Sequence, residues 1–299
     1  RKEEDLKMCQ EMLEPDTRFT TLTISPFIEG YSLSMLGCVT HKGILSSTLQ
    51  LQLIDVPESL HGQLPTGVFL GHDWAFNDWD PSTEGKAQEV VESIGTYLGD
   101  KGYKGIFGID FLYDKKTGDI YPIECNPRFT GALPVYSLMI AHQGVPTIEF
   151  FHIAEHLGFV YDFDFEGVNA MWKKRVPLAH ISVTPKGIHK MPLALPAGVY
   201  SFHPKEREIR YQRPGAFYWD LKKSNEFILI DSLPREGHAV IQNVPRLCKL
   251  IFPRKIATST FSVEKDIGQL LEIVSDEFRA NQPDIAELPA EEGAMEFEG

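Results

Sequence analysis

The stretch Gly105–Gly131, GIFGIDFLYDKKTGDIYPIECNPRFTG, decides how this chain is interpreted. Residues 107–113 and 120–125 are largely apolar, and the polar segment 115–119 between them contains a glycine. Two runs of strand-forming residues on either side of such a segment are typical of a β-hairpin. We therefore predict two antiparallel strands joined by a tight turn.

The register of this hairpin places two carboxylates face to face. If Asp114 and Ile120 close the turn, Asp110 lies directly opposite Glu124. Side chains alternate between the two faces of a strand. We expect a buried apolar face made of Phe107, Ile109, Phe111, Tyr113, Tyr121, Ile123 and Cys125. The other face then carries Gly108, Asp110, Glu124 and Asn126.

Opposed carboxylates destabilise a sheet, and a divalent cation is the simplest compensation. Mg²⁺ takes oxygen ligands, and Asp110, Glu124 and Asn126 offer only carboxylate oxygens or an amide carbonyl. Arg128 follows, with a planar guanidinium suited to phosphate or carboxylate. The alternative is a solvated hairpin face that binds no metal.

An acid in a G-x-D-F strand, a turn, and then E-x-N-P-R together resemble the metal-binding hairpin of the ATP-grasp superfamily. The similar branch is that of biotin carboxylase and carbamoyl phosphate synthetase, and the resemblance covers roughly Thr20–Gly158. It implies that Asp110, Glu124 and Asn126 hold Mg²⁺, with Mn²⁺ as an alternative, against ATP. It also implies that Arg128 is a catalytic residue that faces the phosphates or an acyl phosphate.

Residues Phe19–Met35 read as two strands around a turn at Gly30. In the resembled family such a stretch forms the hinge that receives adenine, so Phe27 and Ile28 are expected to contact the base. Many members carry an acidic residue two positions after the glycine, where it holds the ribose. This chain has Ser32 there, and Glu29 is the substitute that we consider. An ordinary strand pair remains the alternative.

The resemblance also predicts that part of the fold is missing. We find no glycine-rich run followed by a lysine, which the family uses to contact phosphates, and the chain begins with Arg1 rather than Met. We therefore expect residues 1–160 to be the C-terminal lobe of an ATP-grasp fold, an antiparallel sheet with flanking helices whose N-terminal half is absent. Beyond it we expect a small β-rich domain, residues 161–278, with a closing helix at 261–278, and a disordered acidic tail, residues 279–299.

Local patterns add four expectations. Residues 57–81 read as a long irregular loop that carries His61 and His72 as candidate substrate contacts and is anchored by Trp74 and Trp79. Ser82 is a candidate N-cap for a helix that ends near Gly99. Residues 133–157 form two helices separated at Gly144–Pro146. The overall fold class is α+β.

Composition narrows the function further. The formal net charge of −13 argues against nucleic acid as a partner. The four cysteines, Cys9, Cys38, Cys125 and Cys248, form no C-x-x-C pair, which favours a reducing cytoplasm over a zinc or disulfide framework. No apolar run of about 18 residues suggests a membrane segment.

These features together predict a ligase that depends on ATP and Mg²⁺. Such an enzyme activates a small carboxylate as an acyl phosphate, which an amine or similar nucleophile then attacks. A homo-oligomer or a partner chain could supply the missing half. The alternative is a non-catalytic nucleotide-binding or scaffold module that has lost the phosphate loop.

Overall fold

The structure is a computed structural model that describes residues 7, 25–60, 67–184, 189–190, 195–233, 239–240 and 246–278. The predicted acidic tail, His61 and residues 19–24 of the predicted strand pair lie outside the described residues.

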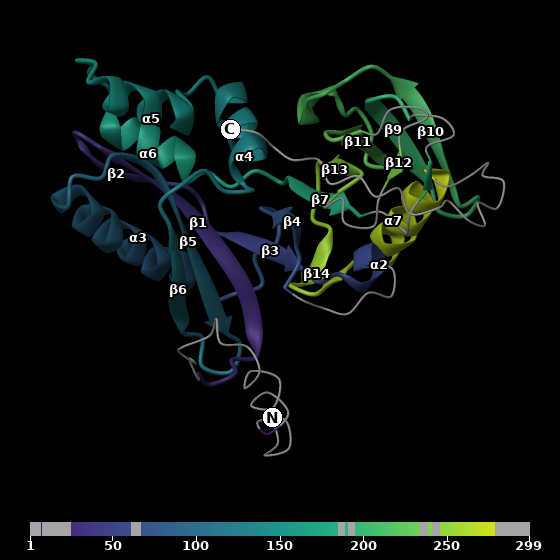
Figure 1. The fold of residues 1–299 in the computed structure, drawn as a ribbon, viewed down its shortest axis with the longest axis horizontal. Helices are drawn as coiled ribbons and strands as arrows, with labels where there is room; N and C mark the ends of the chain where they lie inside the picture. The colour runs from purple at the N-terminus through teal and green to yellow at the C-terminus, as the bar shows by residue number, and fades with distance from the viewer. Residues whose placement is uncertain are drawn as a thin grey trace, which may run out of the picture.

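An antiparallel sheet forms the body of the molecule (Figure 1). Within the described residues, eleven strands join it in the order β10-β9-β11-β13-β7-β4-β3-β1-β5-β6, with β2 paired to β1. Their bounds are β1 Gly30–Thr40, β2 Gly43–Ser46, β3 Gln50–Ile54, β4 Phe69–Asp73, β5 Gly105–Asp114, β6 Ile120–Asn126, β7 Ala179–Val183, β9 Gly198–His203, β10 Glu208–Arg213, β11 Glu226–Ile230 and β13 Cys248–Phe252. Two short ladders pair β8 (His189–Lys190) with β12 (Ala239–Val240), and β14 (Ala257–Ser259) with β15 (Ser262–Val263). The α+β class is confirmed.

Helices cover both faces of this sheet. They are α2 Pro57–Leu60, α3 Ser82–Asp100, α4 Leu133–His142, α5 Ile148–Leu157, α6 Phe165–Trp172 and α7 Lys265–Glu277, with a 3₁₀ turn η1 at Tyr218–Asp220. The apolar sides of α3 and α7 share one core with Phe107, Ile109 and Phe111 of β5. Helices α4, α5 and α6 share the other core with Leu36 and Ile106. The side chain of Asp110 therefore lies on the same face of the sheet as α4–α6. These helices do not cover the part of that face where Asp110 lies.

The predicted hairpin forms, and Asp110 pairs with Glu124 as expected. The turn register is nevertheless wrong by one residue, because Tyr113, not Asp114, pairs with Ile120. A β-bulge at Ile123, between the Asp110–Glu124 and Phe111–Pro122 pairs, absorbs the difference. A bulge inserts one extra residue in one strand and locally disrupts the ladder.

Burial on β6 differs from the expectation. Phe107, Ile109, Phe111 and Tyr113 of β5 are buried, but Tyr121, Ile123 and Cys125 of β6 are exposed. One physical reason is the bulge, because beyond it Tyr121 pairs with Leu112 and so lies on the face opposite to Phe111. The other is that β6 is the edge strand of the sheet and has a neighbouring strand on one side only. The predicted apolar face is therefore correct for β5 and wrong for β6.

The segment 57–81 is not the irregular loop that the sequence predicted. It contributes α2 and the strand β4, which pairs with β3 and β7 in the middle of the sheet. A Cβ at Gly71 would lie 2.0 Å from the carbonyl oxygen of His180, so this strand needs glycine where β7 approaches. Trp74 is completely buried and Trp79 packs on the core, which confirms their anchoring role.

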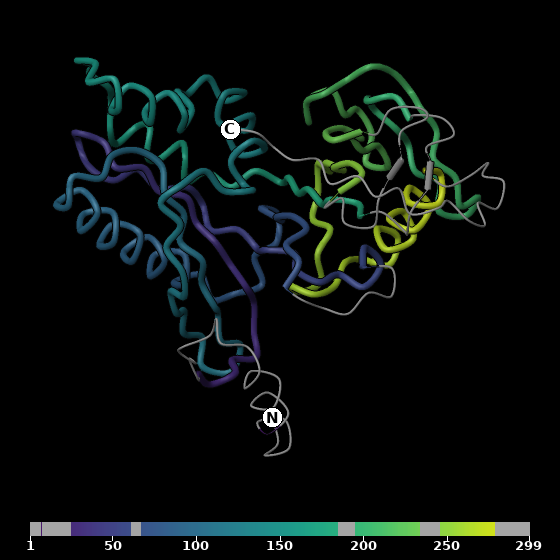
Figure 2. Tube along the Cα trace, in the orientation of Figure 1, coloured from purple at the N-terminus to yellow at the C-terminus, as the bar shows by residue number. Residues whose placement is uncertain are grey.

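The second half of the chain continues the same sheet (Figure 2). Strand β7 pairs with β4, so hydrogen bonds run without a break from residues 69–73 into the predicted β-rich domain. Helix α6 was not expected there, whereas α7 confirms the predicted closing helix. The division at residue 160 stays a prediction.

Two helix predictions have different outcomes. Ser82 is not the N-cap of α3, because Pro81 holds that position and makes no side-chain cap. Instead Asp80 accepts a hydrogen bond from the backbone N–H of Ser82 at 2.8 Å. The break between α4 and α5 at residues 144–146 is confirmed.

Glu226 on β11 provides a pH-dependent stability prediction. Arg213 donates to its two carboxylate oxygens at 2.9 and 2.8 Å, which lowers the pKa of Glu226 to about 2. The pKa of Glu226 is lower in the folded than in the unfolded protein, so its ionised carboxylate stabilises the fold. This stabilisation is complete above about pH 4.5 and is lost as the pH falls towards 2. Glu226→Gln should therefore lower the free energy of unfolding by about 2 kcal/mol at pH 7.

The measurement is urea unfolding of both proteins between pH 7 and pH 3, with the exposed Glu208→Gln as control. The difference in the free energy of unfolding between wild type and Glu226→Gln should become smaller below about pH 4.5. A difference that stays constant down to pH 3 would contradict this assignment.

Candidate functional site

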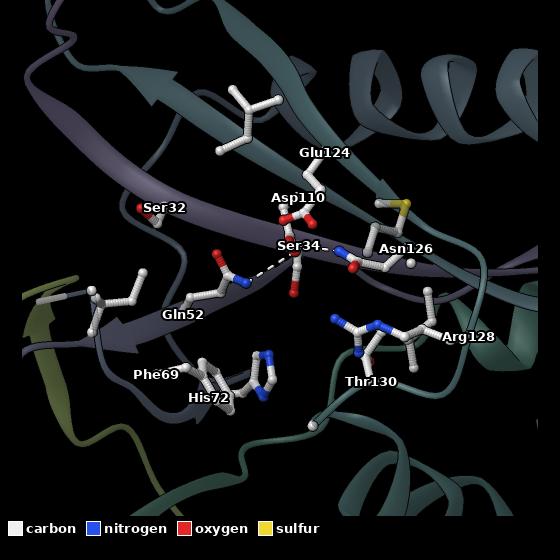
Figure 3. A pocket seen from close by; sticks show the side chains of 17 residues that line it. Ser32, Ser34, Gln52, Phe69, His72, Asp110, Glu124, Asn126, Arg128 and Thr130 are labelled. Atoms are coloured by element: carbon white, nitrogen blue, oxygen red, sulfur yellow. Dashed lines mark hydrogen bonds between the residues drawn. The ribbon is translucent and has the colours of Figure 1, made fainter. Parts of the chain in front are cut away.

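A cavity of about 380 Å³ opens on the polar face of the sheet, where α4–α6 leave the strands uncovered. Strands β1, β3, β4, β5 and β6 form its floor, and the segment after β6 closes one side (Figure 3). Its polar lining comprises Ser32, Ser34, Gln52, His72, Asp110, Glu124, Asn126, Arg128 and Thr130. The residues that the hairpin motif singled out therefore share one cavity with side chains from three other strands.

Asp110 is the most strongly perturbed carboxylate of this cavity. Burial, and then the neighbouring charge of Glu124, raise the pKa of Asp110 to about 6. Gln52 Nε2 donates to Asp110 Oδ1 and Asn126 Nδ2 donates to Asp110 Oδ2, each at 3.0 Å (Figure 3). These two amides orient the carboxylate but do not neutralise it.

The donor set fits a hard divalent cation. Within the described residues neither Asp110 nor Glu124 is in an ion pair, and the charge of Arg128 offsets their repulsion only in part. Because Nδ2 of Asn126 faces Asp110, its Oδ1 is left for another ligand. Mg²⁺ is usually held by one or two carboxylates together with phosphate oxygens and water. In the part of the chain that the structure describes, no group of three His, Cys, Asp or Glu side chains could hold a metal.

Arg128 lines the same cavity from the segment after β6. One guanidinium nitrogen donates to the backbone oxygen of Phe129 at 3.1 Å, and the side chain is exposed. Its positive charge lowers the pKa of Asp110, although burial and Glu124 prevail. Among the described residues it has no carboxylate partner, which leaves it free to bind an anion.

The four predicted nucleotide contacts do not come together. Ser32 lines the cavity, and its backbone N–H donates to Thr260 Oγ1 at 2.8 Å. Phe27, Ile28 and Glu29 precede β1 outside the lining, and the Glu29 carbonyl accepts from the N–H of Lys115 at 3.3 Å. Their roles at adenine and ribose stay predictions.

Sequence reasoning missed Gln52 and Ser34. Gln52 holds Asp110, and Ser34 pairs with Asp110 across β1 and β5 and accepts from Gln50 Nε2 at 3.0 Å. Leucine and glutamine alternate along β3, which is typical of a half-solvated strand. The polar half of that pattern faces the cavity at Gln52, so the signal was present in the sequence.

Comparison with known families supports the hairpin assignment. Residues 4–132 match the family model described as the ATP-grasp domain. This match confirms the resemblance to the ATP-grasp superfamily. It includes Asp110, Glu124, Asn126 and Arg128, so the matched region contains the whole predicted metal-binding motif.

Solved structures share the fold of this chain. One is the biotin carboxylase domain of 2-oxoglutarate carboxylase from Hydrogenobacter thermophilus, with 16% identity, a TM-score of 0.52, and coverage of 85% of this chain and 49% of that chain. Another is biotin carboxylase from Campylobacter jejuni, with 14% identity, a TM-score of 0.53, and coverage of 84% and 48%. The expected similarity to the biotin carboxylase branch is thus confirmed for the fold.

The chain spans about half the length of these structures. No curated protein matches its sequence. Among the described residues, no helix is long and apolar enough to cross a membrane.

Proposed function

We propose that this chain is the metal-binding part of an ATP-dependent ligase that activates a small carboxylate as an acyl phosphate. The observation that carries the proposal is the opposed pair Asp110–Glu124, with Asn126 beside it, in the wall of one cavity. Two opposed carboxylates that form no ion pair among the described residues favour a site that a divalent cation completes.

Each lining residue has a role in this proposal. Asp110, Glu124 and Asn126 would hold Mg²⁺, and Gln52 keeps the Asp110 carboxylate oriented. The chemistry that Mg²⁺ would supply there is neutralisation of phosphate charge. Arg128 would bind the transferring phosphate or the acyl phosphate, because its guanidinium is free to form paired hydrogen bonds with oxyanions.

The reaction balances with ATP and two further substrates. A carboxylate oxygen attacks the γ-phosphorus and ADP leaves, which gives an acyl phosphate. An amine then attacks the acyl carbon, phosphate leaves as the new C–N bond forms, and the nitrogen loses one proton to water or to the departing phosphate. The Hydrogenobacter structure is described with MgADP and bicarbonate, which supports an anion beside a magnesium nucleotide in this fold.

Hydroxylamine trapping tests the chemistry. The full-length protein, incubated with ATP, Mg²⁺, hydroxylamine and a panel of small carboxylates, should form a hydroxamate with at least one of them. Formation should require both ATP and Mg²⁺, because the trapped species is the acyl phosphate. Arg128→Lys should reduce the rate by about tenfold to a thousandfold, since lysine cannot provide the planar fork.

The control is Asp119→Asn, which removes an exposed carboxylate at the hairpin turn, away from the cavity lining. It should leave hydroxamate formation unchanged. Tight binding of Mg-nucleotide without any hydroxamate or ADP formation would instead identify a non-catalytic nucleotide-binding module.

A further inference from the structure

His72 and His180 form a buried pair at the end of the cavity opposite the hairpin. They are directly paired across β4 and β7, and Nδ1 of His72 lies 3.3 Å from Nε2 of His180. The two residues are only 3% and 1% exposed. His72 lines the cavity and His180 does not, so the pair connects the cavity to the interior of the sheet.

Only one hydrogen can lie between the two rings, and the surroundings of His180 decide which ring donates it. Nδ1 of His180 is buried and has no hydrogen-bond partner among the residues that the structure describes. If His72 donated, a neutral His180 would carry its own hydrogen on that nitrogen, as an unpaired buried N–H. Orphaned buried N–H groups are rare and costly. The favoured arrangement has His180 Nε2–H donating to His72 Nδ1.

This arrangement fixes which nitrogen of His72 carries the hydrogen. With Nδ1 as the acceptor, a neutral His72 must carry its hydrogen on Nε2, the ring nitrogen that is not used in the contact with His180. Burial, and then Lys249, lower the pKa of His72 to about 3, and burial, His72, Lys249 and Arg246 lower that of His180. The cavity is therefore offered a neutral N–H donor.

The neighbours of His72 define a small anion subsite. The ring of Phe69 lies 4.7 Å from the His72 ring and forms an apolar wall. A Cβ at Gly131 would lie 2.7 Å from the ring of Phe69, so a glycine at this position allows that ring to pack closely against the backbone. Figure 3 shows Arg128 and Thr130 across the cavity from Phe69 and His72. The subsite thus combines a cation, a hydroxyl, an N–H donor and an apolar surface.

We propose that His72 binds the substrate carboxylate through Nε2–H, and that His180 is a positioning residue that fixes the tautomer of His72. Naming the ligand as the substrate rests on the proposed ligase function. A neutral donor suits an attacking carboxylate, because it orients one oxygen without placing a full positive charge on the nucleophile. The subsite would therefore select a small carboxylate with a short apolar group against Phe69.

Nitrogen NMR on protein labelled with ¹⁵N-histidine tests the tautomer without any nucleotide. The His72 signals, assigned by their loss in His72→Gln, should show a protonated Nε2 and an unprotonated Nδ1 from pH 6 to pH 8. Sodium acetate, added alone, should shift the Nε2 signal. A protonated Nδ1, titration in this range, or no response to acetate would overturn the proposal.

Three variants separate binding from folding. His72→Leu should weaken acetate binding about tenfold or more, because it removes a hydrogen bond to a charged group. His72→Gln, which keeps an N–H donor near Nε2, should retain most of the affinity, and His180→Leu should give a mixture of His72 tautomers. Equal acetate affinity in His72→Leu and wild type, with unchanged circular dichroism, would contradict the assignment.

The test of the carboxylate subsite at His72 can fail or succeed independently of the test of the ligase function. Asp110→Asn should abolish the response to MgADP and leave the acetate shift at His72 intact. Acetate binding at His72 in a protein that never binds MgADP would refute the ligase and keep the carboxylate subsite. MgADP binding without any acetate effect would refute the subsite alone.

Discussion

Glu124→Gln should weaken the binding of MgADP by roughly 100-fold, since losing one partner of a close charge pair costs about 2–5 kcal/mol. Glutamine keeps the size of the side chain but lacks the charge that a divalent cation needs. The same change should leave the ligand-free fold as stable as wild type or more stable, because Glu124 is exposed and repels Asp110. Weaker binding together with a fold that is not weakened distinguishes a metal ligand from a structural carboxylate.

Isothermal titration of both proteins with ADP, with and without Mg²⁺, provides the measurement. Thermal unfolding without ligand provides the stability comparison. Asp119→Asn, on the same hairpin but outside the cavity lining, is the matched control and should behave as wild type. If Glu124→Gln bound MgADP as tightly as wild type, Glu124 would not be a metal ligand.

Asp73→Asn should lower the free energy of unfolding by about 2–5 kcal/mol. Asp73 is completely buried at the end of β4. One carboxylate oxygen accepts from the N–H groups of Ala75 and Phe76, both at 2.9 Å, and the other accepts from those of Ile256 and Ala257 at 2.8 and 2.9 Å. An asparagine must turn its NH₂ group towards one of these pairs, which leaves two buried N–H donors unpaired.

Urea unfolding followed by tryptophan fluorescence measures this effect. Asp73 joins β4 to a segment more than 180 residues later in the chain, so its loss should also loosen the contact between β4 and β14. Asp119→Asn again serves as the exposed control. A change below about 1 kcal/mol would show that water or a local shift replaces the missing acceptor.

The hairpin illustrates how much of the site could be predicted from the sequence. The predicted pairing of Asp110 with Glu124 is correct only because the bulge at Ile123 offsets the one-residue error in the turn register. The spacing did not predict the bulge at Ile123 or the exposure of β6, which depends on that bulge and on the position of β6 at the sheet edge. Pro122 was an available signal, since proline within a strand favours an edge or a bulge.

Strand β4 shows why the rest could not be predicted. Its five residues, flanked by Gly67 and interrupted by Gly71, give no clear alternation, and its neighbours β3 and β7 lie far apart in sequence. Local pattern cannot specify such pairing. For the same reason, the sequence suggested His72 as a substrate contact but gave no indication of its partner His180, which lies 108 residues away in the chain.

The position of the bound metal would show whether the Asp110–Glu124 pair is the metal site. Crystals grown with ADP and Mn²⁺, measured at an X-ray energy where manganese scatters anomalously, would locate the ion independently of any model. We expect an anomalous peak within about 2.0–2.3 Å of oxygens of Asp110, Glu124 and Asn126, with ADP phosphate oxygens completing the coordination. A nucleotide-bound manganese held elsewhere, with Asp110 and Glu124 unligated, would contradict this expectation.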